Sequence, residues 1–550
     1  MKDNIGKRIC GPSGLFFATL TVLIAPNVWL SVCEPMGWAA RLANVLLPGG
    51  LYVLLMTVFR NQGRMVWGVF VLLFLSAFQL VLLYLYGHSI IAVDMFLNLV
   101  TTNSAEVGEL LGSLLPAVIG VVVVFLPILI VASCHLRDAG YVLEAAFRRR
   151  VRTYGAVTAA AGAVMTAVAY MVGPYAIVDD MYPFNVGYNI CLAAQRTGLA
   201  AEREAASADF SFGACSTHAD SIPEIYVMVV GETARAENFG LFGYERDTTP
   251  LLSSTSGLIA FPKAFTQSNT THKSVPMLLS AATADDFDRL YREKGVLTAF
   301  REAGFHTVFL SNQRRNHSFI DLLGEEADTC RFLKEEMPEG DMTLDGALVD
   351  ELGKIVAEGH RKLFVVLHTY GSHFKYHERY PRATAVFTPD EVADVKASNR
   401  EQLVNAYDNT IRYTDSVLHS LIECIDSTGA AGALVYTSDH GENIFDDNRG
   451  LFLHASPRPS AHELHVPMIA WLSPDYEARY VSVGENLRRN AAERVLTSAS
   501  MFHTMLDIAG IDTPFRADSL SVASASYRPG EYHYLTDRNI PVPVEKAMLR

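Results

Sequence analysis

The chain begins with long apolar segments and continues with short ones. Five segments in the first third are long enough to cross a bilayer core, which takes about 20 helical residues. They lie at residues 12–32, 42–59, 65–87, 110–135 and 153–174. The first follows Lys2, Lys7 and Arg8, as a signal peptide would, but four further spans come after it and favour a retained anchor. The fifth is rich in Ala and Gly, and a buried soluble helix is the alternative for that segment.

Basic residues alternate between the ends of these segments. Lys and Arg precede the first span, lie between the second and third, and cluster between the fourth and fifth, whereas the other two loops hold only Arg41. Because loops rich in Lys and Arg stay in the cytoplasm, the N-terminus is predicted to be cytoplasmic. An odd number of spans then places residues 176–550 outside, which in a bacterium is the periplasm. The sequence therefore predicts a multi-pass inner-membrane protein.

Charge separates the same two regions. Residues 1–175 carry 11 Lys and Arg against 7 Asp and Glu, and the rest carries 34 against 52, a net charge of −18. With a mean hydropathy of +0.18 and 19% charged residues, the chain is not disordered, a coiled coil or a simple soluble enzyme. The acidic surplus argues against a nucleic-acid partner. We predict a transmembrane domain of five helices at 1–175, a connector at 176–220 and a periplasmic domain at 221–550.

The apolar pattern after residue 220 alternates between strands and helices. Runs rich in β-branched and aromatic residues lie at 224–230, 306–310, 362–367, 433–437 and 467–472. Helical stretches such as 295–303 and 399–425 separate them. Continuous apolar strands that alternate with helices are typical of an α/β fold whose mostly parallel sheet is covered by helices on both faces.

Polar side chains that can bind a metal follow these strands. Glu232 comes after the first strand, and Asp439 and His440 come after the fourth. Open α/β sheets bind ligands beyond the carboxyl ends of their strands, so we expect residues distant in sequence to meet at that edge. Two carboxylates and an imidazole suit Zn²⁺ or a similar divalent ion. The alternative for each residue alone is a loop side chain that caps a backbone amide.

A polar turn at 268–276 supplies candidates for a nucleophile. It leads into an apolar helix, and a helix N-terminus favours anions. A Thr hydroxyl attacks poorly unless a metal or a base lowers its pKa, so a hydroxyl beside the predicted metal would suit attack on phosphorus. Spacing does not choose among Ser268, Thr270, Thr271 and Ser274, and an ordinary N-cap run is the alternative.

Six stretches resemble the bacterial phosphoethanolamine transferases, a family that includes lipid A enzymes and the mobilised colistin-resistance enzymes. They are VVGETARAENFGLFGYERDTTP (229–250), SNTTHKSVP (268–276), VVLHTYGSHFKYHERYP (365–381), EQLVNAYDNTIRYTD (401–415), TSDHGEN (437–443) and LHASP (453–457). The resemblance implies a five-helix membrane domain joined to a periplasmic catalytic domain of the alkaline phosphatase and sulfatase superfamily.

The same resemblance implies roles for individual residues. The family's zinc ligands match four residues, Glu232, Thr271, Asp439 and His440. Thr271 also matches the nucleophile that becomes loaded with phosphoethanolamine. His373 and His454 match two histidines that line the phosphate pocket. His368 lies beside them, and a structural role at the end of its strand is the alternative for this residue.

One further match lies between the third and fourth apolar segments. Asn98, Thr102 and Glu106 follow the family's Asn-x₃-Thr-x₃-Glu pattern, and a spacing of four places them on one helix face. There we expect them to bind the donor's headgroup, with the Glu106 carboxylate suited to its ammonium group; a solvated interfacial helix is the alternative. The chain departs from the lipid A branch where Gln267 and Met277 replace two cysteines that flank the nucleophile turn.

These matches predict a two-step transfer that needs Zn²⁺. Phosphatidylethanolamine is the expected donor, and its phosphoethanolamine passes to Thr271 as a covalent phospho-threonine intermediate while His454 or His373 protonates the leaving group. A lipopolysaccharide or other envelope glycolipid then accepts the group, at lipid A or at a core sugar. We expect a monomer. The alternatives are a phosphoglycerol transferase or a phosphodiesterase of the same superfamily, and a non-catalytic membrane scaffold.

Overall fold

The chain forms two compact units. The computed structural model describes residues 11–34, 36–86, 104–137, 142–173, 175–316, 318–336, 343–392, 395–456 and 458–549. The helical unit comprises most residues up to Ala194, and the α/β unit comprises most residues from Gln195 onward. The boundary falls within α10 (Phe184–Ala206), so much of the predicted connector is one long helix.

Apolar helices, most of them long, make up most of the helical unit. They are α2 (Pro12–Cys33), α3 (Trp38–Met56), α4 (Gln62–Gly68), α5 (Phe70–Tyr86), α7 (Ser104–Arg137) and α8 (Ala145–Val172). Within the described residues, four helices are long and apolar enough to cross a membrane. The third predicted span is instead a pair, α4 and α5, bent by 60° after Gly68, a residue type that weakens helices. The predicted count of five requires this pair to be a single span.

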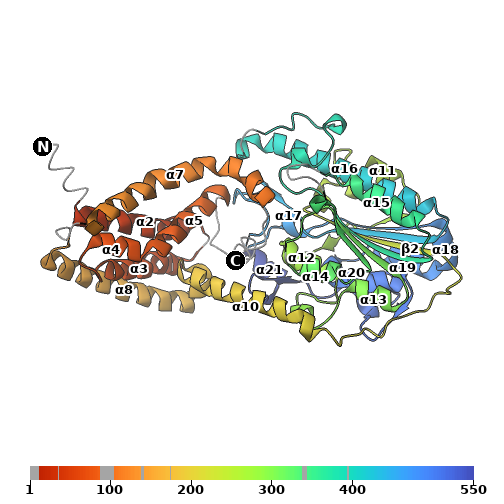
Figure 1. Ribbon diagram of the computed structural model, residues 1–550, viewed down its shortest axis with the longest axis horizontal. Coiled ribbons are helices and arrows are strands. Elements are labelled where there is room, and N and C mark those ends of the chain that lie inside the picture. The colour runs from red at the N-terminus through yellow and green to blue at the C-terminus, as the bar shows by residue number, and fades with distance from the viewer. Residues whose placement is uncertain are drawn as a thin grey trace. The chain divides into compact units, whose positions relative to one another are not determined.

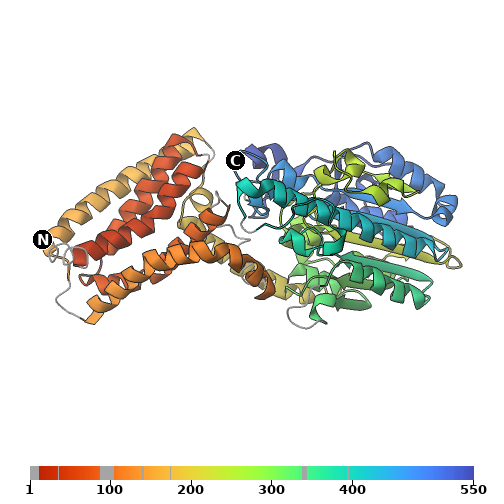
Figure 2. The ribbon, with the colours of Figure 1, turned by 90° about the horizontal axis from the view of Figure 1, so that it is seen from above.

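Glycines allow α3 and α8 to pack closely side by side (Figure 1 and Figure 2). A Cβ atom added to Gly50 would lie 2.3 Å from the nitrogen of Ala159, and one added to Gly162 would lie 2.3 Å from the nitrogen of Leu47. Small residues are common where membrane helices meet, because they let the backbones approach. Only 22% of the apolar window of α8 is buried, which disfavours a buried soluble helix for the fifth segment.

The α/β unit is built around a mostly parallel sheet. Among the described residues its seven strands lie in the order β3–β11–β8–β2–β7–β5–β6. They are β2 (Glu224–Gly231), β3 (Leu258–Ala260), β5 (His306–Ser311), β6 (Thr329–Phe332), β7 (Lys362–His368), β8 (Ala431–Ser438) and β11 (Met468–Leu472). Strand β11 runs antiparallel to β3 and β8, and the other pairs are parallel. The five predicted runs correspond to β2, β5, β7, β8 and β11, so the predicted fold class is confirmed.

Helices cover both faces of this sheet (Figure 1). They are α12 (Thr271–Leu278), α13 (Val296–Glu302) and α20 (Thr497–Ile508) on one face, and α15 (Gly346–Ala357) and α16 (Arg400–Asp426) on the other. Successive residues of β2 alternate between the two cores: Met228 and Val230 pack on the first face, and Val227 and Val229 on the second. Continuous burial on both faces explains why the strand sequences are apolar without alternation.

The parallel register brings the carboxyl ends of four strands to one edge. Gly231 at the end of β2 pairs with Ser438 at the end of β8. Ser311 at the end of β5 pairs with His368 at the end of β7. The polar residues that follow these strands therefore start from the same edge of the sheet.

Arg235 links the loop after β2 to other parts of the α/β unit through an ion pair and hydrogen bonds. Its buried guanidinium pairs with Asp446 at 2.8 Å and donates to Asn238 Oδ1 at 2.6 Å. Arg400 pairs with the other oxygen of Asp446 at 2.6 Å. Burial alone would raise the pKa of Asp446, but the charge of Arg235 and the backbone N–H of Ile444 lower it to about 2.

We expect Asp446→Asn to lower the free energy of unfolding by about 2 kcal/mol near neutral pH, since each unit of pKa change is worth about 1.4 kcal/mol. The folded-state pKa lies below the value of about 3.9 in an unfolded chain. The stabilisation by ionised Asp446 is therefore present above about pH 4 and is lost as the pH falls through 2. Urea denaturation at a series of pH values should show the two proteins converging in acid.

Asp286→Asn is the matched control, because it breaks an exposed ion pair with Arg292. Such pairs contribute less than about 1 kcal/mol, so this variant should unfold almost like the wild type. A stability gap for Asp446→Asn that stays constant down to about pH 2 would contradict the role given to this ion pair.

Candidate metal centre and active site

Metal-binding side chains meet beyond the carboxyl ends of β2 and β8. Glu232 follows β2, Asp439 and His440 follow β8, and at most 1% of each residue is exposed. One ligand atom from each lies within 4.8 Å of the others. Thr271 is the first residue of α12, and its hydroxyl lies against the same group. The structure thus brings together all four residues that were predicted to bind zinc.

Four separations among the ligand atoms are close to those around a tetrahedral ion. Thr271 Oγ1 lies 3.0 Å from His440 Nε2 and 3.3 Å from Glu232 Oε1. His440 Nε2 lies 3.2 Å from Asp439 Oδ2 and 3.6 Å from Glu232 Oε1. Ligands bound at about 2.0 Å to a tetrahedral zinc ion are roughly 3.3 Å apart. The chemistry and these separations of the four residues therefore fit a zinc ion.

Backbone donors occupy one oxygen of Asp439 and leave the other facing the site. Oδ1 accepts the N–H groups of Thr233 at 3.1 Å and of His440 at 2.7 Å. Oδ2 is buried and accepts no hydrogen bond from the described residues. Burial also raises the pKa of Asp439 to about 6, which reflects the cost of a carboxylate charge inside a protein. A divalent cation would satisfy this oxygen and its charge.

Thr233 orients both carboxylates from a strained backbone. Its φ angle is 62°, a left-handed conformation that is costly for a β-branched residue. Its hydroxyl donates to Glu232 Oε1 at 2.7 Å, and its carbonyl accepts the Tyr407 hydroxyl at 2.7 Å. Together with its N–H bond to Asp439, these contacts hold Thr233 between the two acidic ligands.

A backbone carbonyl fixes the tautomer of His440. Nδ1 lies 2.8 Å from the carbonyl oxygen of Gly441, and since a carbonyl can only accept, Nδ1 carries the proton. Nε2 then presents its lone pair to Thr271 and to the metal position. Burial lowers the pKa of His440 to about 3, so the ring is in the neutral form that binds metals.

Contacts in the structure distinguish among the four hydroxyls that the sequence offers as nucleophiles. Ser268 Oγ and Thr270 Oγ1 lie 3.1 Å from each other, and Ser274 Oγ donates to the Thr270 carbonyl at 2.7 Å. Thr271 is the candidate whose hydroxyl contacts the ligands. It also begins α12, and the N-terminus of a helix favours an anion.

His454 lies beside the metal position and is paired with Glu442. Its ring centroid is 4.0 Å from that of His440, and its Nδ1 lies 3.2 Å from Glu442 Oε1. Burial alone would lower the pKa of His454, but the Glu442 carboxylate raises it to about 9. The sequence placed Glu442 in the TSDHGEN stretch, two residues after His440, but predicted no role for it.

Of the other residues predicted to bind substrate, the structure describes His373 and the backbone of Glu106. The charges of Glu232 and His454 both act on the pKa of His373, but burial dominates and lowers it to about 4, so this ring is neutral. Asn98 and Thr102 lie outside the described residues. Glu106 falls within α7.

Gln313 is a second residue that sequence reasoning missed. Its side-chain amide donates to Glu232 Oε2 at 3.2 Å and lies 3.2 Å from His368 Nε2. Nδ1 of His368 in turn lies 3.1 Å from Ser311 Oγ, so both nitrogens of this buried ring are engaged at the ends of β5 and β7. Gln313 comes two residues after β5, and that position beyond a strand end was its only sequence signal.

A model of the sulfatase family matches residues 224–511, more than half of the chain. The chain therefore belongs to the sulfatase family. It is 31% identical over 300 residues to phosphoethanolamine transferase EptA of Escherichia coli, covering 52% of this chain and 54% of the relative. It is 29% identical over 297 residues to the Kdo(2)-lipid A phosphoethanolamine 7''-transferase of Salmonella typhimurium, covering 52% of each. The chain thus spans about half the length of the curated relatives it matches, and the resemblance drawn from its motifs is confirmed.

Solved structures share the fold. The integral membrane lipooligosaccharide phosphoethanolamine transferase A of Neisseria meningitidis superposes with a TM-score of 0.70 and 21% identity, over 92% of this chain and 99% of that one. The periplasmic domain of EptC from Escherichia coli, solved in complex with zinc, gives 0.55 and 22%, over 60% of this chain and 95% of that one. The combination of apolar helices with an alkaline-phosphatase-like unit is therefore confirmed as the fold.

Gly371 packs against the backbone of Glu232, and its substitution tests the metal centre. With φ at 49°, a Cβ atom there would lie 2.6 Å from the carbonyl oxygen of Glu232. We expect Gly371→Ala to displace this ligand and to weaken zinc binding at least about tenfold, as changes around metal ligands do. Competition with a zinc chelator measures the affinity.

Gly304→Ala is the control for backbone strain, since Gly304 has φ at 90° and nothing within 4 Å of an added Cβ atom. It should lower stability without changing zinc affinity. Equal zinc affinities for the two variants would show that the contact of Gly371 with Glu232 does not position the ligand.

Proposed function

We propose that this protein transfers phosphoethanolamine from phosphatidylethanolamine to a lipopolysaccharide acceptor through a covalent intermediate on Thr271. The names of the curated relatives support phosphoethanolamine as the transferred group and lipid A or its core sugars as the acceptor. Because those matches cover about half of each relative, the geometry of the site carries the argument for this chain.

The position of the Thr271 hydroxyl is the observation that supports this proposal most. It lies 3.0 Å from His440 Nε2 and 3.3 Å from Glu232 Oε1, at the start of α12. Glu232, Asp439 and His440 would hold a Zn²⁺ ion with Thr271 as the fourth ligand. When bound, the ion would lower the pKa of the hydroxyl and stabilise negative charge on the phosphoryl oxygens. The zinc complex of the EptC periplasmic domain supports this choice of metal.

Thr271 first loses its hydroxyl proton to solvent. In the first step a bond then forms between Thr271 Oγ1 and phosphorus, and the bond from phosphorus to the diacylglycerol oxygen breaks. N–H groups at the start of α12 stabilise the phosphoryl oxygens. His454, whose charge is balanced by Glu442, protonates the departing diacylglycerol oxygen. In the second step His454 takes the proton from an acceptor hydroxyl or phosphate, whose oxygen attacks phosphorus and releases Thr271. His373, being neutral, binds the phosphoryl group without repelling His454.

The membrane helices confine the enzyme to the surface where both substrates lie. We assign residues 1–175 to a transmembrane domain, 176–220 to a connector and 221–550 to a catalytic domain in the periplasm. Confinement of donor and acceptor to the same membrane raises their effective concentration at the site. Asn98, Thr102 and Glu106 would bind the donor headgroup, and one chain supplies every residue of the proposed mechanism, so the active form is a monomer.

Membership of the sulfatase family does not make sulfate-ester hydrolysis the better proposal. A sulfatase needs Cys or Ser in a Cys/Ser-x-Pro-x-Arg context to form its formylglycine, and the chain has Thr271-His272-Lys273-Ser274 at that place. A threonine hydroxyl cannot be converted to formylglycine. It can accept a phosphoryl group, which favours transfer over sulfate hydrolysis.

Thr271→Ala should abolish the transfer while leaving the fold intact, since the side chain lies at the site and not in the core. Mass spectrometry of lipid A and core oligosaccharide from cells with and without the gene would show one added phosphoethanolamine and locate it. Thr270→Ala, whose hydroxyl contacts Ser268 rather than the ligands, is the control and should keep most of the product. Undiminished product with Thr271→Ala would refute the assignment of the nucleophile.

Removal of zinc by a chelator should abolish the transfer, and added Zn²⁺ should restore it. The buried ligands should hold about one ion per site in the purified protein, and Asp439→Asn should remove it because the unpartnered oxygen is lost. The non-catalytic scaffold needs no metal at this place. Full transfer by a protein shown to be free of zinc would contradict the metal assignment.

A further inference from the structure

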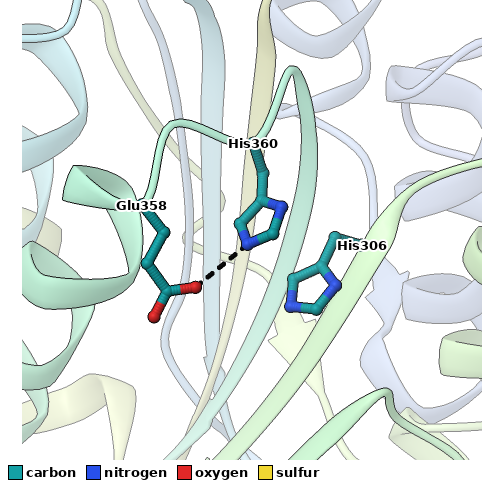
Figure 3. A group of neighbouring side chains, drawn as sticks. All are labelled: His306, Glu358 and His360. Carbon is teal, nitrogen blue, oxygen red and sulfur yellow. Dashed lines mark hydrogen bonds and ion pairs between the residues drawn. The ribbon is translucent and has the colours of Figure 1, made fainter.

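A second group of metal-binding side chains lies at the opposite edge of the same sheet. His306 is the first residue of β5, Glu358 follows the end of α15, and His360 lies in the loop before β7. Figure 3 shows the two imidazoles side by side with the carboxylate facing them. Because β5 and β7 are parallel, this group lies at their amino ends, about 20 Å of strand away from the edge where Thr271 lies.

The three side chains are close enough to share one ion. One ligand atom from each lies within 4.8 Å of the other two. The rings of His306 and His360 lie nearly parallel, with centroids 3.9 Å apart and an angle of 11° between their planes. His360 Nε2 lies 3.0 Å from Glu358 Oε2. Small rotations of these side chains would bring the ligand atoms to the spacing of roughly 3.3 Å that a tetrahedral site needs.

Asp328 lies within ion-pair distance of His306, where metal-bound histidines often have a carboxylate. Its Oδ2 lies 3.7 Å from His306 Nδ1 and accepts both the N–H and the hydroxyl of Thr307 at 2.9 Å. The negative charge of a carboxylate at this place favours a proton on Nδ1, which leaves the other nitrogen free to bind a metal. With Nδ1 facing Asp328, Nε2 is the nitrogen of His306 that faces the ligand group (Figure 3).

We propose that His306, Glu358 and His360 bind a divalent transition-metal ion, with Zn²⁺ as the ion their chemistry suits best. Two imidazoles and one carboxylate are a ligand set that zinc accepts, with the fourth position left to water. The side chains are 29%, 58% and 32% exposed, so an ion can enter directly from solvent. The bound ion would tie the loop between α15 and β7 to the start of β5. Its role is to brace the sheet, and it takes no part in the transfer.

Equilibrium dialysis with Zn²⁺ tests the proposal in the full-length protein. The double variant Glu232→Gln/Asp439→Asn, which should no longer bind zinc at the other centre, is the parent protein with which the further variants are compared. Addition of His306→Gln, or of His360→Gln, should lower the zinc bound by about one ion per chain. Addition of His419→Gln should change nothing, because His419 faces a single carboxylate, Glu423, at 3.4 Å. The same zinc content in the parent and in both His variants would overturn the proposal.

Thermal unfolding supplies an independent measurement. Zn²⁺ should raise the melting temperature of the parent, because ligands that bind only the folded state stabilise it. The shift should be absent with His360→Gln and reduced with Glu358→Gln, whose exposed side chain is not needed for folding. An equal shift in the parent and both variants would contradict the site. With the wild-type centre restored, His360→Gln should leave phosphoethanolamine transfer unchanged, and a loss of transfer would refute the separation of the two centres.

Discussion

Two buried carboxylates that pair with no Lys or Arg among the described residues impose the main constraint on this structure. Glu232 and Asp439 are almost fully buried. Burial keeps the neighbouring His440 neutral, and the charge of His454 is balanced by Glu442. Burial of such charges costs several kcal/mol unless a cation or donors compensate it. Donors satisfy one oxygen of Asp439 but not the other. The arrangement is therefore consistent with a fold whose site is completed by a divalent ion.

The order and register of the strands bring the metal-binding side chains together at the candidate metal centre. Glu232 leaves β2, and Asp439 and His440 leave β8, the strand hydrogen-bonded next to β2, so one register positions the metal-binding side chains. Thr271 does not follow a strand of this sheet; it is the first residue of α12. The strain at Thr233 falls between the acidic ligands, where three hydrogen bonds hold it. The same sheet places a second histidine pair at its opposite edge, where the strands begin.

Much of the α/β unit could be predicted because its strands are apolar on both faces and are bounded by polar residues. The run 306–310, for example, corresponds to β5 within one residue. The bend between α4 and α5 could not be predicted, because hydropathy is insensitive to a local break in a helix. Helix α10 could not be predicted either, because its amphipathic, polar sequence resembles a linker when its packing partners are unknown. The predicted span count and the headgroup pattern at Asn98 and Thr102 stay predictions.

At the site, spacing identified the ligand types, but it could not select Thr271 among four hydroxyls, because their separation depends on where α12 begins. The sequence predicted no role for Glu442 or Gln313, because each acts on another side chain and not on the metal position. Anomalous diffraction at the zinc absorption edge from crystals of the full-length protein tests the central claim most directly. A zinc ion at this centre would give a peak within about 2 Å of Glu232, Thr271, Asp439 and His440. Electron density for a folded site without such a peak, or a peak that Thr271 does not reach, would contradict it.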